Sequence, residues 1–232
     1  MIQIIKDTDR HFSDFGWLKT YWLFSFSNYY DPQNIRFGTL RVFNDDVVAP
    51  GTGFPTHPHE EMEIVTIVLN GEMTHQDSMN NKAVIQTNDV QRMSAGTGLT
   101  HSEYNLAEKP VHFYQIWIYP NVAKLTPSYD QKTYSPENWK NAIFPVASGQ
   151  NISDAVTIHT NATIYRAGID KSKSLTFETT IKRRIFVYIT SGKIKINSET
   201  IHQHDQARID SNIPLQIDGI EDAEFILIDV PA

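Results

Sequence analysis

The chain has 232 residues, of which 40% are hydrophobic, a composition that allows one large all-β unit or two smaller domains with cores of their own. It contains no cysteine, which excludes disulfides, thiolate metal ligands and a cysteine nucleophile. The formal net charge of −7 argues against a nucleic-acid-binding surface, because binding phosphates requires clustered Lys and Arg.

The N-terminal residues do not have the pattern of a targeting segment. Residues 1–17, MIQIIKDTDRHFSDFGW, contain acidic side chains and no uninterrupted apolar run, unlike a secretory signal. No apolar stretch elsewhere approaches the ~20 residues needed to span a membrane. A chain without disulfides suits the reducing cytosol. We therefore expect a cytoplasmic protein that binds neither a membrane nor nucleic acid directly.

Short β-rich runs recur along the chain, separated by Gly, Asn, Asp and Pro, which is typical of antiparallel β-sandwiches and barrels. Helical periodicity is weak throughout. The best candidate for a short helix is SPENWKNAI, residues 135–143, in which Ser135 can cap the helix and Pro136 occupies its first position. The predicted strands lie at residues 35–43, 63–69, 83–87, 111–119, 174–181, 185–192, 193–197 and 225–230.

Two halves of the chain share a faint pattern. Residues 65–75, VTIVLNGEMTH, and residues 187–197, VYITSGKIKIN, each read as an apolar strand, a two-residue turn ending in Gly, and a second strand. The repeat predicts two β-barrel domains joined through a polar stretch near residues 130–155. We place them at residues 1–135 and 136–232.

The segment FPTHPHEEMEIVTIVLNGE, residues 54–72, places two histidines at the head of an apolar strand. Alternate residues of a strand point to the same face, so His57 and His59 share a face if the proline between them lies at a sheet edge. Glu61 and Glu63 have the same parity. A lone His-x-His motif is more often a pair of solvated histidines, and the glutamates alone are more often a charged face.

A second cluster, of one histidine and one glutamate, makes a metal site the better interpretation. SAGTGLTHSEYN, residues 94–105, places His101 and Glu103 on one strand face behind a Gly-rich turn. Two antiparallel strands could gather both pairs around one cavity. Imidazole and carboxylate ligands together suit Fe, Mn, Co, Ni, Cu or Zn rather than Ca or Mg. The two clusters together favour a metal site.

The other histidines fit structural roles better. His75 lies just past a turn and is expected to be hydrogen-bonded or exposed, and His112 precedes an apolar strand and is expected to pack. His202 and His204 form another His-x-His motif, but no acidic pair accompanies them. We expect these two to lie in a surface turn.

Three segments resemble the pirin family, a branch of the cupin superfamily. They are GTGFPTHPHEEMEIVTIVLNGEMTHQDS (51–78), NDVQRMSAGTGLTHSEYN (88–105) and PVHFYQIWIYPN (110–121). The resemblance is strong over roughly residues 10–135 and holds only in outline beyond them. It implies an all-β bicupin: two cupin-type barrels (double-stranded β-helices) with few short helices, packed face to face, with metal only in the N-terminal one.

The resemblance also implies roles for individual residues. By matching positions, His57, His59, His101 and Glu103 would be the metal ligands. Glu63 matches the carboxylate that ordinary cupins use as a ligand; here it would instead hydrogen-bond a ligand or the substrate. The C-terminal half lacks a matching His-x-His motif, which supports a single metal. We expect one divalent transition metal, with Fe²⁺ as first choice and Mn, Co, Ni, Cu or Zn as alternatives.

Members of the family are similar to quercetin 2,3-dioxygenases, which open a flavonol ring with O2. The implied activity is that of a metal-dependent oxidoreductase whose substrates are a flavonol-like or other small aromatic molecule and O2. Glu103 or Glu63 would act as general base. An aromatic substrate needs an apolar pocket. The candidates to line it are Phe43, Met62, Met73 and Met93.

A different class of function fits the same residues. Eukaryotic members of the family are linked to transcription factors, so the protein could be a metal-containing, redox-sensing regulator that binds protein partners. An acidic chain without basic patches suits protein contacts better than DNA contacts. A metal-binding barrel of unknown substrate is a third possibility. We expect a monomer in each case. Turnover of a flavonol under O2 separates catalysis from regulation.

Overall fold

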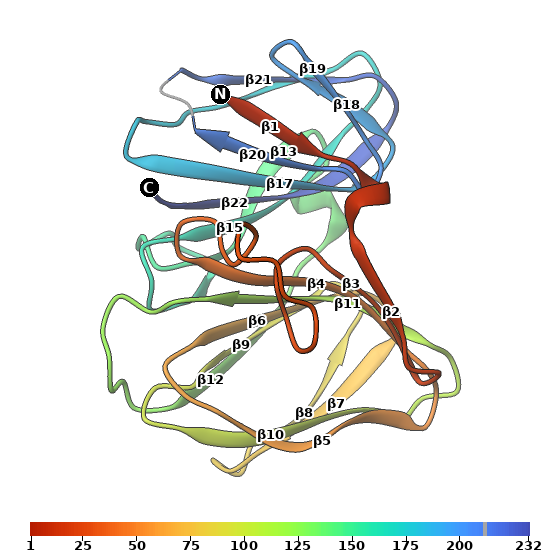
Figure 1. Cartoon of the computed structure of the whole chain (residues 1–232), viewed down its shortest axis with the longest axis vertical. Coiled ribbons are helices and arrows are strands. Elements are labelled where there is room, and N and C mark those ends of the chain that lie inside the picture. The colour runs from red at the N-terminus through yellow and green to blue at the C-terminus, as the bar shows by residue number, and fades with distance from the viewer. Residues whose placement is uncertain (211–212) are drawn as a thin grey trace.

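The computed structural model describes residues 1–210 and 213–232. Within them the chain is almost entirely β-structure, and Figure 1 shows two strand-rich bodies, one above the other. The helical elements described are two 3₁₀ turns, η1 (Asp7–Asp9) and η2 (Pro136–Asn138), and no described helix is long and apolar enough to cross a membrane. The prediction of an all-β fold with two barrels is confirmed.

The N-terminal barrel is built from a seven-stranded and a four-stranded sheet, both antiparallel in the described residues. The larger sheet has the order β12-β9-β6-β11-β4-β3-β2 and the smaller one β5-β10-β7-β8. The strands are β2 (His11–Asp14), β3 (Leu18–Trp22), β4 (Leu40–Val48), β5 (Thr52–His59), β6 (Glu63–Asn70), β7 (Glu72–Asp77), β8 (Lys82–Gln86), β9 (Asp89–Ser94), β10 (Leu99–Asn105), β11 (Val111–Ile118) and β12 (Ser128–Thr133).

The C-terminal barrel repeats this plan with the sheet orders β1-β20-β17-β22-β15-β13-β14 and β16-β21-β18-β19 among the described strands. Its strands are β1 (Ile2–Ile5), β13 (Ala142–Ser148), β14 (Val156–Thr157), β15 (Thr163–Ile169), β16 (Ser174–Phe177), β17 (Arg183–Ser191), β18 (Lys193–Ile196), β19 (Glu199–His202), β20 (Gln206–Asp210), β21 (Leu215–Gly219) and β22 (Ala223–Pro231).

The first strand of the chain belongs to the sheet of the C-terminal barrel. β1 pairs with β20, placing Ile2 opposite Ile209, and the chain then passes through η1 to β2 at the edge of the other barrel (Figure 1). The N-terminal segment therefore ties the two barrels together. The domain division at residue 135 stays a prediction.

The predicted helix start near residue 135 is present but short. Ser135 accepts a hydrogen bond from the backbone N–H of Glu137, Asn138 closes a capping box, and Pro136 is the first residue of the turn. The turn ends at Asn138 because the chain enters β13 four residues later, and an isolated turn without an apolar face gains little from continuing as a helix.

Aromatic rings pack between the two barrels. Phe43 of β4 and Tyr114 of β11 meet Phe186 and Tyr188 of β17, and the ring centroids of Phe43 and Phe186 are 5.3 Å apart. The prediction that Phe43 lines a substrate pocket is therefore wrong, because its ring is fully buried in this shared core. The interior of the C-terminal barrel is filled by aliphatic side chains such as Ile194.

Candidate metal centre and aromatic cavity

Three histidines meet on one face of the smaller N-terminal sheet. β5 is an edge strand of that sheet, so one of its sides has no neighbouring strand. Pro55 and Pro58, which have no backbone N–H to donate, are therefore tolerated in it. β5 pairs with β10, and His57 lies opposite His101. The Nε2 atoms of His57 and His59 each lie 3.0 Å from Nε2 of His101. The shared face of His57 and His59 is confirmed.

The spacing of these nitrogens fits a shared metal ion. Two nitrogens bound at ~2.1 Å and at right angles to one another lie about 3.0 Å apart. The state of the imidazoles also fits, because a ligand imidazole must be neutral. Burial, assisted by the neighbouring histidines, lowers the pKa of His59 to about 4 and that of His101 to about 3.

The tautomer of His57 is set by a backbone carbonyl. Nδ1 of His57 lies 2.7 Å from the carbonyl oxygen of Pro55. A carbonyl oxygen only accepts, so Nδ1 carries the proton and donates. The lone pair of Nε2 is then free and faces His101, which is the arrangement a metal ligand requires.

A buried pair behind His101 orients it in the same way. Nε2 of His75 lies 3.2 Å from a carboxylate oxygen of Asp77, and Nδ1 of His75 lies 3.4 Å from Nδ1 of His101. Burial raises the pKa of Asp77, but hydrogen bonds led by those from Asn81 and His75 lower it on balance. The ionised Asp77 accepts from Nε2–H of His75, which leaves Nδ1 of His75 to accept from Nδ1–H of His101. Nε2 of His101 then faces the other two histidines as a free base.

Glu103 places a carboxyl group beside this cluster. It lies opposite His75 in the pairing of β10 with β7, and ligand atoms of His75, His101 and Glu103 all lie within 4.8 Å of one another. One oxygen of Glu103 accepts a hydrogen bond of 2.9 Å from Gln115, whereas Oε1 is buried without a partner among the described residues. Burial raises the pKa of this carboxyl group. A bound cation would supply the partner that Oε1 lacks.

Glu61 and Glu63 do not continue the histidine face, because the chain turns between β5 and β6. Glu61 lies in that turn with a φ of 49°, and Glu63 begins a strand of the other sheet. A carboxylate oxygen of Glu63 accepts hydrogen bonds from Ser94 (2.9 Å) and from the backbone N–H of His159 (3.0 Å), and Glu63 does not line the cavity described below. A catalytic role for Glu63 stays a prediction that these contacts do not favour.

A cavity of about 370 Å³ opens beside the histidines. His57, His59, Glu103 and Gln115 reach it, as do Asn44 and Asp46 of β4. The ring of Trp117 stands at 83° to that of His59, with the centroids 4.9 Å apart. The walls are otherwise mainly aromatic: Phe15, Trp17, Trp22, Phe26, Phe54 and Trp117.

The methionines expected in this cavity lie elsewhere. Met73 packs in a cluster with Val68, and Met62 and Met93 pack with Ile64, so none of the three lines the cavity. The aromatic wall was not predicted from the sequence, although the run FGWLKTYWLFSFSNYY (residues 15–30) is dense in rings. Density alone does not show that these rings reach the histidines, since that contact depends on strand pairing between distant segments.

His75, His112, His202 and His204 have the structural roles expected, with two additions. His75 is hydrogen-bonded, as one of its two expected roles required, but its position behind His101 was not foreseen. His112 donates a hydrogen bond of 2.6 Å to the carboxylate of Asp45 rather than only packing. His202 is exposed and His204 half-buried at a turn, and neither joins a group of metal-ligating side chains in the described part of the chain.

Acidification is expected to destabilise the metal-free protein through His59 and His101. In the unfolded chain these side chains bind protons near pH ~6.5, whereas in the folded chain they resist protonation down to about 4 and about 3. The unfolded state binds more protons between these values, so stability falls as the pH falls. Asp46, whose pKa burial raises to about 8, contributes with the opposite sign. The test must therefore compare variants.

Urea unfolding of the metal-free protein at about pH 7 and about pH 5 makes that comparison. His101→Gln should lose less stability between the two pH values than the unsubstituted chain. His202→Ala, a change at an exposed side chain, is the control and should keep the original difference. Equal losses in His101→Gln and the unsubstituted chain would show that His101 is not held neutral by burial.

Comparisons with known proteins match both halves of the chain. Residues 5–118 match the family model described as Pirin, and residues 145–230 match the one described as Quercetinase C-terminal cupin domain. A pirin-like protein of Caulobacter vibrioides is 39% identical over 218 residues, covering 94% of each chain. A quercetin 2,3-dioxygenase of Escherichia coli K12 is 37% identical over 232 residues, covering 100% of this chain and 99% of its own.

Solved structures agree with this result. The crystal structure of YhhW from Escherichia coli has a TM-score of 0.95 and 37% identity, covering 100% of this chain and 98% of that one. A second structure, described as the bacterial pirin YhhW in complex with nickel(II), has a TM-score of 0.94 and the same identity, covering 100% and 99%. The predicted pair of cupin-type barrels is confirmed by these likenesses.

Proposed function

The chain belongs to the pirin family, and from that premise we propose that it is a metal-dependent dioxygenase acting on a flavonol-type aromatic ring. One observation carries the proposal: three imidazole Nε2 atoms converge beside a cavity walled by aromatic rings. Relatives named quercetin 2,3-dioxygenase and the nickel(II) complex of a bacterial pirin support it.

We propose His57, His59, His101 and Glu103 as the ligands of one divalent transition metal, with Fe²⁺ as the first candidate. The donor set of three imidazoles and one carboxylate suits such metals. When bound, the metal supplies a positive charge that favours an ionised substrate hydroxyl, together with the redox chemistry that a reaction with O2 requires.

The side chains around the ligands have three tasks. The aromatic walls bind a flat ring by stacking and exclude water from it. Gln115 holds one oxygen of Glu103 in place. The other oxygen, Oε1, has no protein partner in the described residues and would face the metal, and its second lone pair could accept the proton of a substrate hydroxyl as general base.

Oxygen uptake tests the proposal. Protein loaded separately with Fe²⁺, Mn²⁺, Co²⁺, Ni²⁺, Cu²⁺ or Zn²⁺ should consume O2 with a flavonol for at least one redox-active metal. A flavone that lacks the 3-hydroxyl group should give no uptake. His57→Ala should abolish the reaction, since it removes one of the three converging nitrogens.

His202→Ala, which changes an exposed imidazole outside the cavity, is the matched control and should keep full activity. Stoichiometric metal binding without O2 uptake for any flavonol would contradict the proposal. That outcome would favour the alternative in which the metal site serves regulation through a protein partner.

A further inference from the structure

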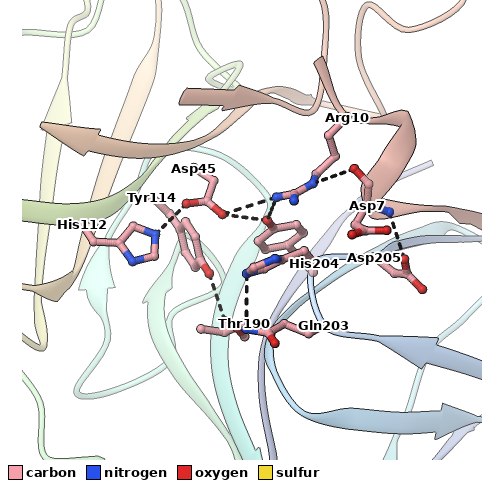
Figure 2. Close-up of polar contacts among 10 residues, drawn as sticks. Asp7, Arg10, Asp45, His112, Tyr114, Thr190, Gln203, His204 and Asp205 are labelled. Carbon is pink, nitrogen blue, oxygen red and sulfur yellow. Dashed lines mark hydrogen bonds and ion pairs between the residues drawn. The ribbon is translucent and has the colours of Figure 1, made fainter. Parts of the chain in front are cut away.

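β4 presents different side chains to the two sides of the larger N-terminal sheet. Asn44 and Asp46 line the aromatic cavity, as alternate residues of one strand should. Asp45, between them, faces the other barrel. It contacts His112 of the neighbouring strand β11 (2.6 Å; Figure 2) and Tyr188 of the C-terminal barrel (2.7 Å). Arg10 lies 3.7 Å from the same carboxylate. The carboxylate of Asp45 therefore has polar and charged partners. Asp46 faces the cavity on the opposite side of the sheet and contacts none of these partners.

Asp46 is a buried carboxyl group that the fold satisfies only in part, through a hydrogen bond from Thr20, its neighbour on β3. Its side chain is almost fully buried, and Oδ1 has no hydrogen-bond partner among the described residues. Asn44 and Glu103 line the same cavity, and Oδ1 of Asn44 and Oε1 of Glu103 also lack partners among the described residues. Buried polar groups in proteins are almost always paired. The metal would pair with Oε1 of Glu103, so the unpaired oxygens of Asp46 and Asn44 point to a further ligand group that pairs with them.

The chemistry of these atoms defines the ligand class. The unpaired atoms of Asp46 and Asn44 are both oxygens, so the ligand should bring hydrogen-bond donors. Burial raises the pKa of Asp46 to about 8. A hydrogen bond from Thr20 opposes this rise, and the negative charges of Asp45 and Glu103 add to it. Near neutral pH the group is therefore mostly a neutral acid that can also donate. A hydroxyl group both donates and accepts hydrogen bonds. It can therefore pair with Asn44, and with Asp46 whether that carboxyl group is protonated or ionised.

We propose that Asp46 is a specificity-determining residue of the cavity, whose carboxyl group hydrogen-bonds a second hydroxyl group of the substrate. The substrate class is then an aromatic molecule with at least two hydroxyls, one directed to the histidines and Glu103 and one to β4. This inference rests on the proposed function for the position of the first hydroxyl. The contact with Asp46 depends only on the cavity.

Equilibrium binding tests this without relying on turnover. Quenching of tryptophan fluorescence reports ligand entry, because Trp17, Trp22 and Trp117 line the cavity. Two pairs of ligands are titrated into the metal-free and the Zn²⁺-loaded full chain. One pair is a polyhydroxylated flavonol and a flavonol with only its 3-hydroxyl group; the other is a dihydroxybenzene and phenol. Metal content is measured for every variant.

The unsubstituted chain should bind the polyhydroxylated member of a pair roughly tenfold or more tightly. Asp46→Leu, of similar size, should remove this preference by weakening the polyhydroxylated ligand alone. Asp46→Asn, which still hydrogen-bonds, should keep most of it. Metal content should not change in either variant, and that result separates a ligand contact from damage to the site.

The outcomes separate the two proposals. If the flavonols do not bind but the dihydroxybenzene is preferred and needs Asp46, the flavonol function fails and the role of Asp46 holds. If Asp46→Leu weakens both members of each pair equally, or if neither pair shows a preference in the unsubstituted chain, the inference about Asp46 is overturned.

Discussion

Replacing Glu103 by alanine is expected to remove most of the bound metal and to abolish turnover of any flavonol, whereas replacing Glu63 should leave most of the metal bound. Ligand atoms of Glu103 and His101 lie within 4.8 Å of each other, and Glu103 lines the cavity beside the histidines. Oε1 of each glutamate lacks a partner in the described residues, so this feature does not distinguish them. Glu63 belongs to another sheet and is hydrogen-bonded to Ser94 and the backbone of His159. Both glutamates are almost fully buried, so burial alone does not distinguish the two variants.

Metal content and O2 uptake are measured for Glu103→Ala, Glu103→Gln and Glu63→Ala at equal protein concentration. Loss of a ligand should weaken metal binding by more than the ~10–100-fold that is typical for residues supporting a ligand. Glu103→Gln retains the shape of the side chain and should also bind weakly, because it lacks the charge. If Glu63→Ala lost its metal while Glu103→Ala kept it, the ligand assignment would be wrong.

The second large effect is expected at His75. Its ring links the carboxylate of Asp77 to Nδ1 of His101. His75→Phe fills the same space but cannot accept the proton of His101, so the tautomer with a free Nε2 is no longer favoured. We expect metal affinity to fall by ~10–100-fold. Asp77→Asn should have a similar direction of effect, although Asp77 also accepts the backbone N–H groups of Met79 and Asn81.

Competition with a chromophoric chelator measures this affinity without any substrate. The matched control is His112→Phe, since His112 also contacts a buried aspartate but lies outside the cavity. The control should keep the affinity of the unsubstituted chain. An unchanged affinity in His75→Phe would show that the pair behind His101 does not set its tautomer.

The three histidines were predictable because strand alternation is a local rule. His57, His59 and His101 each needed only a correct strand and a sheet edge for the prolines. The same rule failed at Glu61, where the backbone has a positive φ in a segment without Gly or Pro to signal the turn. Extending the strand parity across that turn misplaced Glu63.

The rest of the site depends on contacts between distant segments. Trp22 and Asp46 line the same cavity as the histidines only because β3 and β4 belong to the sheet facing β5 and β10. Phe43 looks equivalent to its neighbours in the sequence, yet its parity in β4 sends it to the other barrel. No local pattern reveals which face of a strand meets which sheet.

The pairing of β1 with β20 bears on the order of events during synthesis. Ile2 leaves the ribosome well before its partner Ile209, on the order of ten seconds or more earlier at ~5–20 residues per second. All four proposed ligands lie between His57 and Glu103, so they are outside the ribosome well before β1 can dock. The nascent chain therefore has an interval in which metal can reach the histidines while the apolar strand IQII is still unpaired and exposed to chaperones.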